Sequence, residues 1–130
     1  MNPSSLVLVD SSVWVHFFKY SEASILTDLI AENLACTNEL ILTELIPFAH
    51  YKKQQGLIEG LLAVEIIPLA IDWEGIRMLQ ITNLQNGINH VGIPDLIIAQ
   101  QALEYKMQLW STDKHFELMA DIIELNVFSP

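Results

Sequence analysis

The amino-acid sequence predicts an α/β domain with a central parallel sheet. Short β-prone runs alternate with longer runs in which apolar residues recur at helical spacing, and this alternation is typical of parallel strands joined by helices. The first run, residues 6–9, is apolar throughout, as expected for a strand that helices cover on both faces. Together these observations favour one sheet packed between helices.

The order of elements in the first third of the chain follows from where the apolar pattern changes. The strand at residues 6–9 ends at Asp10, and a helix is predicted for residues 12–19. A second helix, at residues 22–33, has its apolar residues on one face. A short strand at residues 34–37 completes this part of the fold.

The middle of the chain contains two more predicted helices and a strand. The helix at residues 39–51 includes Pro47, which predicts a kink or a break because proline cannot donate a helical hydrogen bond. A helix at residues 54–63 then leads into a strand at residues 64–67.

The last part of the chain repeats the alternation. The predicted elements are a helix at residues 72–86, a loop at 87–92, a helix at 94–105, a strand at 108–111, a helix from about Asp113 and a terminal edge strand at 122–125. Pro94 suits the first position of its helix, since that position needs no backbone N–H donor.

Length and composition set the class of protein. The 130 residues predict a single domain, residues 1–130. The hydrophobic fraction is 52% and the mean hydropathy is +0.35, which predicts either an unusually complete core or an apolar surface kept for a partner. No membrane segment is expected, because Glu65 and Pro68 interrupt the longest apolar stretch, residues 61–71. The N-terminus lacks the basic start of a signal peptide, and a lone Cys36 favours a cytoplasmic location.

The net charge of −10, from 16 acidic residues against 6 Lys and Arg, bears on the class of substrate. A strongly acidic chain repels phosphate backbones and is a poor non-specific binder of nucleic acids. A nucleic-acid substrate would therefore require either a favourable local placement of charge or a bound metal ion.

Three of four candidate acidic residues are expected near the carboxyl ends of strands, where chemistry gathers in a parallel sheet. Asp10 ends the first strand, Asp113 follows the strand at 108–111, and Asp95 is in the first turn of a helix, while Glu44 is mid-helix in an apolar run. Singly, each could be a helix cap, a dipole partner, a turn residue or a solvated side chain. Together they predict a carboxylate cluster, which needs a hard cation such as Mg²⁺ or Mn²⁺.

The motifs around these acids resemble those of PIN-domain ribonucleases, the toxins of VapC type in toxin–antitoxin pairs. The four stretches are VLVDSSVWVHFFK around Asp10, ILTELI around Glu44, GIPDLIIAQQALEY around Asp95 and LWSTDKHFE around Asp113. Their order and spacing match the family across nearly the full length. The resemblance implies a PIN-like three-layer sandwich, a central parallel sheet flanked by helices.

The resemblance also implies an activity, Mg²⁺- or Mn²⁺-dependent cleavage of RNA phosphodiester bonds. Asp10, Glu44, Asp95 and Asp113 would be the catalytic metal ligands. Ser12, together with Ser111 or Thr112, would orient the acids or the attacking water. The implied partners are an RNA substrate and a small antitoxin protein.

The sequence departs from the family pattern near the second and fourth acids. Leu45, Ile46 and Pro47 follow Glu44, where many relatives have a basic residue. Thr112 stands where relatives often have Asn, and His115 stands where many carry a further acid. The last change predicts one firmly held ion rather than two, and makes His115 a candidate general acid.

Lysines are the candidate RNA contacts. Lys52 and Lys53 form a basic patch with His50, and Lys114 adjoins Asp113. A solvated helix end is an equally good interpretation of that patch. The apolar excess predicts a homodimer surface, an antitoxin groove or both, on the helices at residues 22–33 and 39–63.

Three other classes of protein are alternatives, and two of them fit the sequence poorly. A PIN fold that has lost catalysis would only bind partners. A Mg²⁺-binding receiver domain would need two adjacent acids after the first strand, but Ser11 follows Asp10. A haloacid-type phosphatase would need Asp-x-Asp, but Ser12 occupies the second acidic position.

Overall fold

The chain folds around a five-stranded sheet in which every pairing is parallel. The computed structural model describes residues 6–20 and 25–130. The strands are β1 (Val7–Val9), β2 (Ala35–Thr37), β3 (Glu65–Ile66), β4 (Gln108–Trp110) and β5 (Asn126–Val127), in the order β3-β2-β1-β4-β5. This confirms the predicted α/β class and its parallel sheet.

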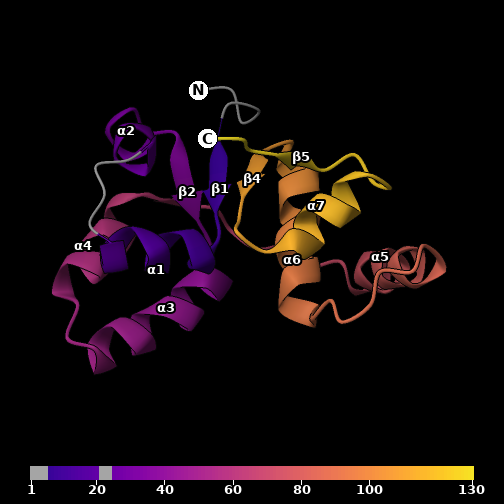
Figure 1. Cartoon of the computed structure of the whole chain (residues 1–130), viewed down its shortest axis with the longest axis horizontal. Coiled ribbons are helices and arrows are strands. Elements are labelled where there is room, and N and C mark those ends of the chain that lie inside the picture. Colours follow the sequence, from indigo (N-terminus) through magenta and orange to yellow (C-terminus); the bar gives the residue numbers. More distant parts are fainter. Residues whose placement is uncertain (1–5, 21–24) are drawn as a thin grey trace.

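Helices connect and flank the strands. In the described residues they are α1 (Ser11–Tyr20), α2 (Ile25–Ala31), α3 (Glu39–Tyr51), α4 (Gln55–Ala63), α5 (Trp73–Gln85), α6 (Ile93–Tyr105) and α7 (Lys114–Ala120). In Figure 1, α1, α3 and α4 gather on the β2 side of β1, while α6 and α7 lie beside β4 and β5, and α5 lies farther out beyond α6. The central strand β1 therefore lies between two groups of helices.

The core covers both faces of the central strands. All three residues of β1 are buried, and so are all three of β2. Because successive side chains of a strand point to opposite faces, complete burial means that both faces are packed. Trp14 of α1 and Phe116 of α7 are among the largest fully buried side chains. None of the helices in residues 6–20 and 25–130 is long and apolar enough to cross a membrane.

The terminal strand is not where the apolar pattern placed it. The prediction of a strand at residues 122–125 is wrong, because β5 is Asn126–Val127. The backbone N–H groups of Ile122 and Ile123 both donate to the Met119 carbonyl and close the end of α7. Their apolar side chains therefore belong to a helix end, and pairing with β4 begins only at Asn126.

Two predicted helices differ in detail from those observed. Helix α3 runs without interruption through Pro47, so the predicted break does not occur. The second predicted helix began at residue 22, and residues 22–24 lie outside the described residues. Its described part is α2, which ends at Ala31, and Asn33 beyond it has a positive φ of 57°.

Candidate functional site

Asp10 and Asp113 are brought together because β1 and β4 are neighbours in the sheet. Asp10 directly follows β1, and its backbone N–H donates to the Trp110 carbonyl at 2.9 Å, which extends the β1–β4 pairing. Asp113 lies three positions past the end of β4. Both acids therefore stand at the carboxyl edge of the sheet, as the sequence predicted.

The Asp10 carboxylate is buried and accepts hydrogen bonds from serine hydroxyls, a long one from Ser11 Oγ to Oδ1 at 3.5 Å and two shorter ones to Oδ2. Its residue is only 6% exposed. Ser111 Oγ donates to Asp10 Oδ2 at 2.7 Å, and Ser12 Oγ donates to the same oxygen at 3.1 Å. A buried carboxylate is costly unless its oxygens accept hydrogen bonds. The serines supply that compensation and fix the orientation of the group.

Ser12 and Ser111 also position the segment that carries Asp113. The backbone N–H of Asp113 donates to Ser111 Oγ at 3.0 Å, and the backbone N–H of Thr112 donates to Ser12 Oγ at 3.1 Å. Of the predicted orienting residues, Ser12 and Ser111 therefore contact Asp10 directly. Thr112 is exposed, and its contact with this network is through its backbone.

Asp113 is the N-cap of α7 and lies beside His115. Its Oδ1 accepts from the His115 backbone N–H at 2.9 Å, and the same oxygen lies 3.0 Å from His115 Nδ1. N-capping, the structural alternative for Asp113, is thus observed. The cap uses Oδ1, and the side chain remains about one-third exposed at 36%.

Asp95 stands at the start of α6 and is half-buried. Desolvation raises the pKa of its carboxyl group, and the nearby charges of Asp113 and Asp10 raise it further. The His115 imidazole and a backbone hydrogen bond from this turn oppose the rise. The raised pKa therefore reflects partial burial first and the neighbouring carboxylates second.

Glu44 reaches the same cluster from α3. Partial desolvation raises the pKa of its carboxyl group, with further contributions from Asp10 and Asp95. Glu44 is an exposed residue at the rim of the cluster, so solvent screens this repulsion more than it does for Asp95. The structure thus brings all four predicted acids into one neighbourhood.

The residues present fit a divalent cation. Asp95, Asp113 and His115 each offer a ligand atom, and these atoms all lie within 4.8 Å of one another. The adjoining carboxylates of Asp10 and Glu44 add negative charge that a cation would neutralise. Carboxylate oxygens are the ligands that Mg²⁺ and Mn²⁺ prefer.

Sequence reasoning missed a buried amide pair behind this site. Asn38, the N-cap of α3, accepts from the Ile41 backbone N–H at 2.8 Å and donates to Gln101 Oε1 at 2.8 Å. Gln101 Nε2 donates to the Ile67 and Pro68 carbonyls, both at 3.2 Å. The N-cap position of Asn38 was a usable signal, but nothing in the pattern of α6 distinguished Gln101.

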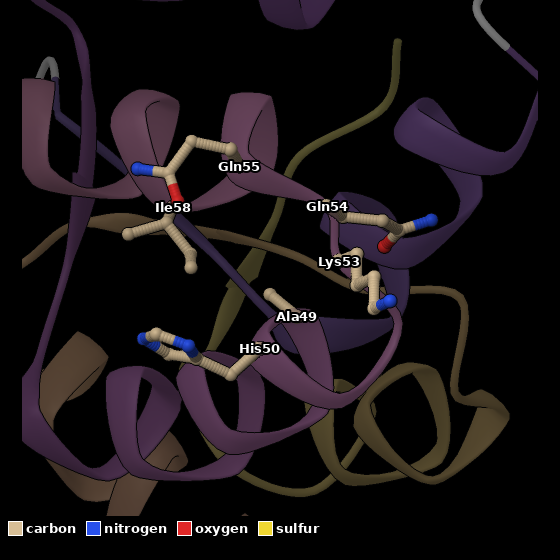
Figure 2. A pocket seen from close by; sticks show the side chains of 6 residues that line it. All are labelled: Ala49, His50, Lys53, Gln54, Gln55 and Ile58. Atoms are coloured by element: carbon tan, nitrogen blue, oxygen red, sulfur yellow. The ribbon is translucent and has the colours of Figure 1, made fainter.

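The predicted basic residues divide into two groups. Lys114 is exposed and adjoins Asp113 in the chain. Lys52 and Lys53 follow α3, and helical rise places them roughly 12 Å beyond Glu44 along its axis. Figure 2 shows His50 and Lys53 around a pocket of about 250 Å³ between α3 and α4, which is lined by Ala49, His50, Lys53, Gln54, Gln55 and Ile58.

Comparison with known proteins agrees with this arrangement. The family model described as PIN domain matches residues 7–122. The DNA-bound VapBC structure from Salmonella typhimurium is similar with a TM-score of 0.76 at 17% identity, covering 95% of this chain and 96% of that one. VapBC2 from Rickettsia felis, bound to a promoter DNA fragment, has a TM-score of 0.76 at 19% identity, covering 95% and 97%.

A third structure, VapBC-1 from nontypeable Haemophilus influenzae, has a TM-score of 0.68 at 17% identity and covers 95% of this chain and 97% of that chain. No curated protein matches in sequence. At these identities the structural likeness establishes a shared fold.

Proposed function

Because this chain belongs to the PIN domain family, we propose that it is a Mg²⁺- or Mn²⁺-dependent endoribonuclease. The observation that carries the proposal is the meeting of Asp10, Glu44, Asp95 and Asp113 from four separate segments, where partial burial and the neighbouring carboxylates raise the pKa values of Glu44 and Asp95. Like charges held together in this way repel one another, and a counter-charge relieves the repulsion. A divalent cation is the counter-charge that also serves phosphodiester hydrolysis.

Each acid has a distinct place in the proposed centre. Asp10, fixed by Ser12 and Ser111, is the rigid ligand. Asp95 and Asp113 complete the ligand set from the starts of α6 and α7. Glu44, at the exposed rim, is suited to hold a water molecule or accept its proton. The bound ion would activate water and neutralise charge on the phosphate.

A metal ion bound among the four acids would also explain how so acidic a chain could bind RNA. A chain of charge −10 repels RNA as a whole. An ion bound among the carboxylates would create a local site for a phosphate group, and the exposed Lys114 beside Asp113 would add a second positive charge there. Lys52 and Lys53 are candidate contacts for a more distant part of the strand.

The test is cleavage of single-stranded RNA by the full chain with Mg²⁺ or Mn²⁺. Asp10→Asn and Asp95→Asn each remove a ligand charge and little volume, and should abolish cleavage while the far-UV circular dichroism spectrum is retained. Asp121→Asn, at the exposed end of α7, is the matched control and should cleave like the parent. Full activity of either ligand variant would remove that residue from the centre.

A parent protein that binds metal but cleaves no RNA would instead support the alternative, a PIN fold that serves only to bind partners. Measuring metal binding in the same preparation distinguishes this outcome from a protein that fails to cleave RNA only because no metal is bound.

The partners proposed are a small antitoxin and a second copy of this chain. The similar structures are those of VapBC proteins, and we propose the antitoxin surface on α3 and α4, where Phe48, Tyr51 and Leu62 are exposed. The sequence placed both surfaces on the helices at residues 22–33 and 39–63. We now propose α5 for the homodimer instead, because its exposed residues Trp73, Met78, Ile81 and Leu84 offer a second apolar surface.

The proposed location is the cytoplasm. Cys36 is a free thiol in the core, and its pKa is raised to about 12 by burial and by Glu65. A single cysteine, which has no second cysteine for a disulfide, suits a reducing compartment.

A further inference from the structure

An imidazole lies inside the carboxylate centre at the position where the sequence departs from the family pattern. His115, on the first turn of α7, offers a nitrogen within 4.8 Å of ligand oxygens of both Asp95 and Asp113. Its side chain is 31% exposed, so it is partly enclosed by the site rather than extended into solvent. The ligand set available here therefore contains nitrogen as well as oxygen.

The spacing of these atoms is close to what one ion needs. Two ligands adjacent in an octahedral shell, each about 2.1 Å from the metal, lie about 3.0 Å apart, and opposite ligands lie about 4.2 Å apart. His115 Nδ1 and Asp113 Oδ1 are 3.0 Å apart, the separation of adjacent ligands and also that of a direct ion pair. The ligand atoms of Asp95, Asp113 and His115 all lie within 4.8 Å of one another, so small side-chain movements would bring them around one ion. A bound ion would then replace the proton between His115 and Asp113.

The backbone holds His115 in this place. The N-cap hydrogen bond from the His115 backbone N–H to Asp113 Oδ1, 2.9 Å long, fixes the two residues relative to each other. The hydrogen bond from the Asp113 N–H to Ser111 Oγ then ties this turn to Asp10. His115 is therefore positioned by the same contacts that position the acids.

We infer that His115 is a nitrogen ligand of the metal centre and that the centre consequently prefers Mn²⁺ to Mg²⁺. Mg²⁺ is a hard ion that binds oxygen and gains little from imidazole, whereas first-row transition-metal ions accept both kinds of ligand. The inference rests on the proposed function for the existence of the centre. It replaces the general-acid role considered for His115 from the sequence.

The experiment measures metal binding directly, without RNA. Mn²⁺ and Mg²⁺ are titrated separately into the metal-free full chain by calorimetry, and the Mn²⁺-loaded protein is examined for nitrogen coupling by pulsed electron paramagnetic resonance. Three variants are compared with the parent: His115→Gln, His115→Asp, and His50→Gln, an exposed histidine on α3 that is the matched control. Circular dichroism and melting temperature establish that each variant is folded.

The parent should bind Mn²⁺ more tightly than Mg²⁺ and show nitrogen coupling. His115→Gln should remove the coupling and weaken Mn²⁺ binding about tenfold or more, with Mg²⁺ binding nearly unchanged. His115→Asp should also remove the coupling and should shift the preference toward Mg²⁺, because it supplies an oxygen ligand at the same place. His50→Gln should behave like the parent.

Two results would overturn the inference: a parent that lacks nitrogen coupling, or a His115→Gln variant that keeps the Mn²⁺ preference of the parent. Either would leave the proposed nuclease standing if RNA cleavage still required Asp10 and Asp95. Conversely, nitrogen coupling from His115 in a protein that cleaves no RNA would support this ligand and refute the proposed activity. A protein that binds neither ion would refute both.

Discussion

The side-chain amide of Asn38 donates a 2.8 Å hydrogen bond to the side-chain oxygen of Gln101, and both residues are almost fully buried. Asn38 caps the helix that carries Glu44, and Gln101 lies on the helix that carries Asp95. Each acid is six residues along its helix from this contact, or roughly 9 Å of helical rise. The pair therefore joins two helices that supply the metal centre.

Removing this contact should destabilise the fold. In Gln101→Ala, the buried Asn38 amide loses its acceptor and the Ile67 and Pro68 carbonyls lose their donor. Unsatisfied buried polar groups cost about 1–3 kcal/mol each, so we expect a loss of about 2–4 kcal/mol in urea unfolding. Gln100→Ala is the control, because neighbouring Gln100 bonds the exposed backbone of Asp72. An equal loss in the two variants would contradict the role assigned to burial.

Substitution can show whether Ser111 or Thr112 orients Asp10. Ser111→Ala removes the 2.7 Å bond to Asp10 and the acceptor of the Asp113 N–H. We expect metal-dependent RNA cleavage to fall about tenfold or more, as losses of groups that support metal ligands do, and stability to fall by about 1–2 kcal/mol. Thr112→Ala should leave both nearly unchanged, since Thr112 is exposed and joins the network through its backbone. Comparable losses in both would mean that Thr112 also orients the site.

Charge repulsion within the centre predicts that Glu44→Gln melts at a higher temperature than the parent in chelator at neutral pH. The pKa of Glu44 is raised by partial desolvation and by Asp10 and Asp95, so the folded state binds its proton more tightly than the unfolded state does. The ionised carboxylate is therefore unfavourable above the raised pKa, and that cost disappears as the pH falls through it. The advantage of Glu44→Gln should shrink in the same acidic range.

Thermal denaturation with and without Mn²⁺ measures this effect. An ion at a hundred times its dissociation constant adds about 2.7 kcal/mol to stability, and the gain at a fixed Mn²⁺ concentration should be larger for the parent than for Glu44→Gln. Glu59→Gln, on the exposed side of α4, is the control. Identical melting of parent and Glu44→Gln in chelator would show that solvent fully screens Glu44 from the other acids.

Self-association should depend on α5. Ile81 and Leu84 are 45% and 57% exposed, and they lie on one helical face with Trp73. Ile81→Lys should convert a dimer into a monomer in sedimentation experiments at micromolar concentration, because it places a charge in the proposed interface. Tyr51→Lys, which changes the exposed end of α3, should leave the dimer intact. A parent that is already monomeric would refute the dimer.

Much of the fold could be predicted because its local patterns agree with the tertiary structure. The β1 strand is apolar throughout since both faces are packed, and Pro94 marks the start of α6 to within one residue. The exceptions arise where contacts elsewhere in the structure, rather than the local sequence, determine the secondary structure. Ile122 and Ile123 have the composition of a strand, but the backbone bonds to Met119 place them at a helix end. Likewise, Pro47 predicted a kink or a break, whereas α3 continues through it.

The acids of the centre could be predicted because each one stands at an element boundary or interrupts an apolar run. The contacts among them could not, since they depend on which strands are neighbours. Ser111 was one of two hydroxyl candidates, and only the pairing of β1 with β4 puts its Oγ against Asp10. The proximity of His115 to Asp95 likewise required the placement of α7 beside the start of α6.

The pairing of β1 with β4 has a consequence for the protein while it is being made. These neighbouring strands come from opposite ends of the chain. A ribosome that has reached residue 87 has added Asp10 and Glu44 but has yet to add Asp95, Asp113 and His115. The unfinished polypeptide therefore lacks both the strand that pairs with β1 beside Asp10 and three of the proposed ligands. For a chain proposed to cut RNA, this delays activity until His115 has been added.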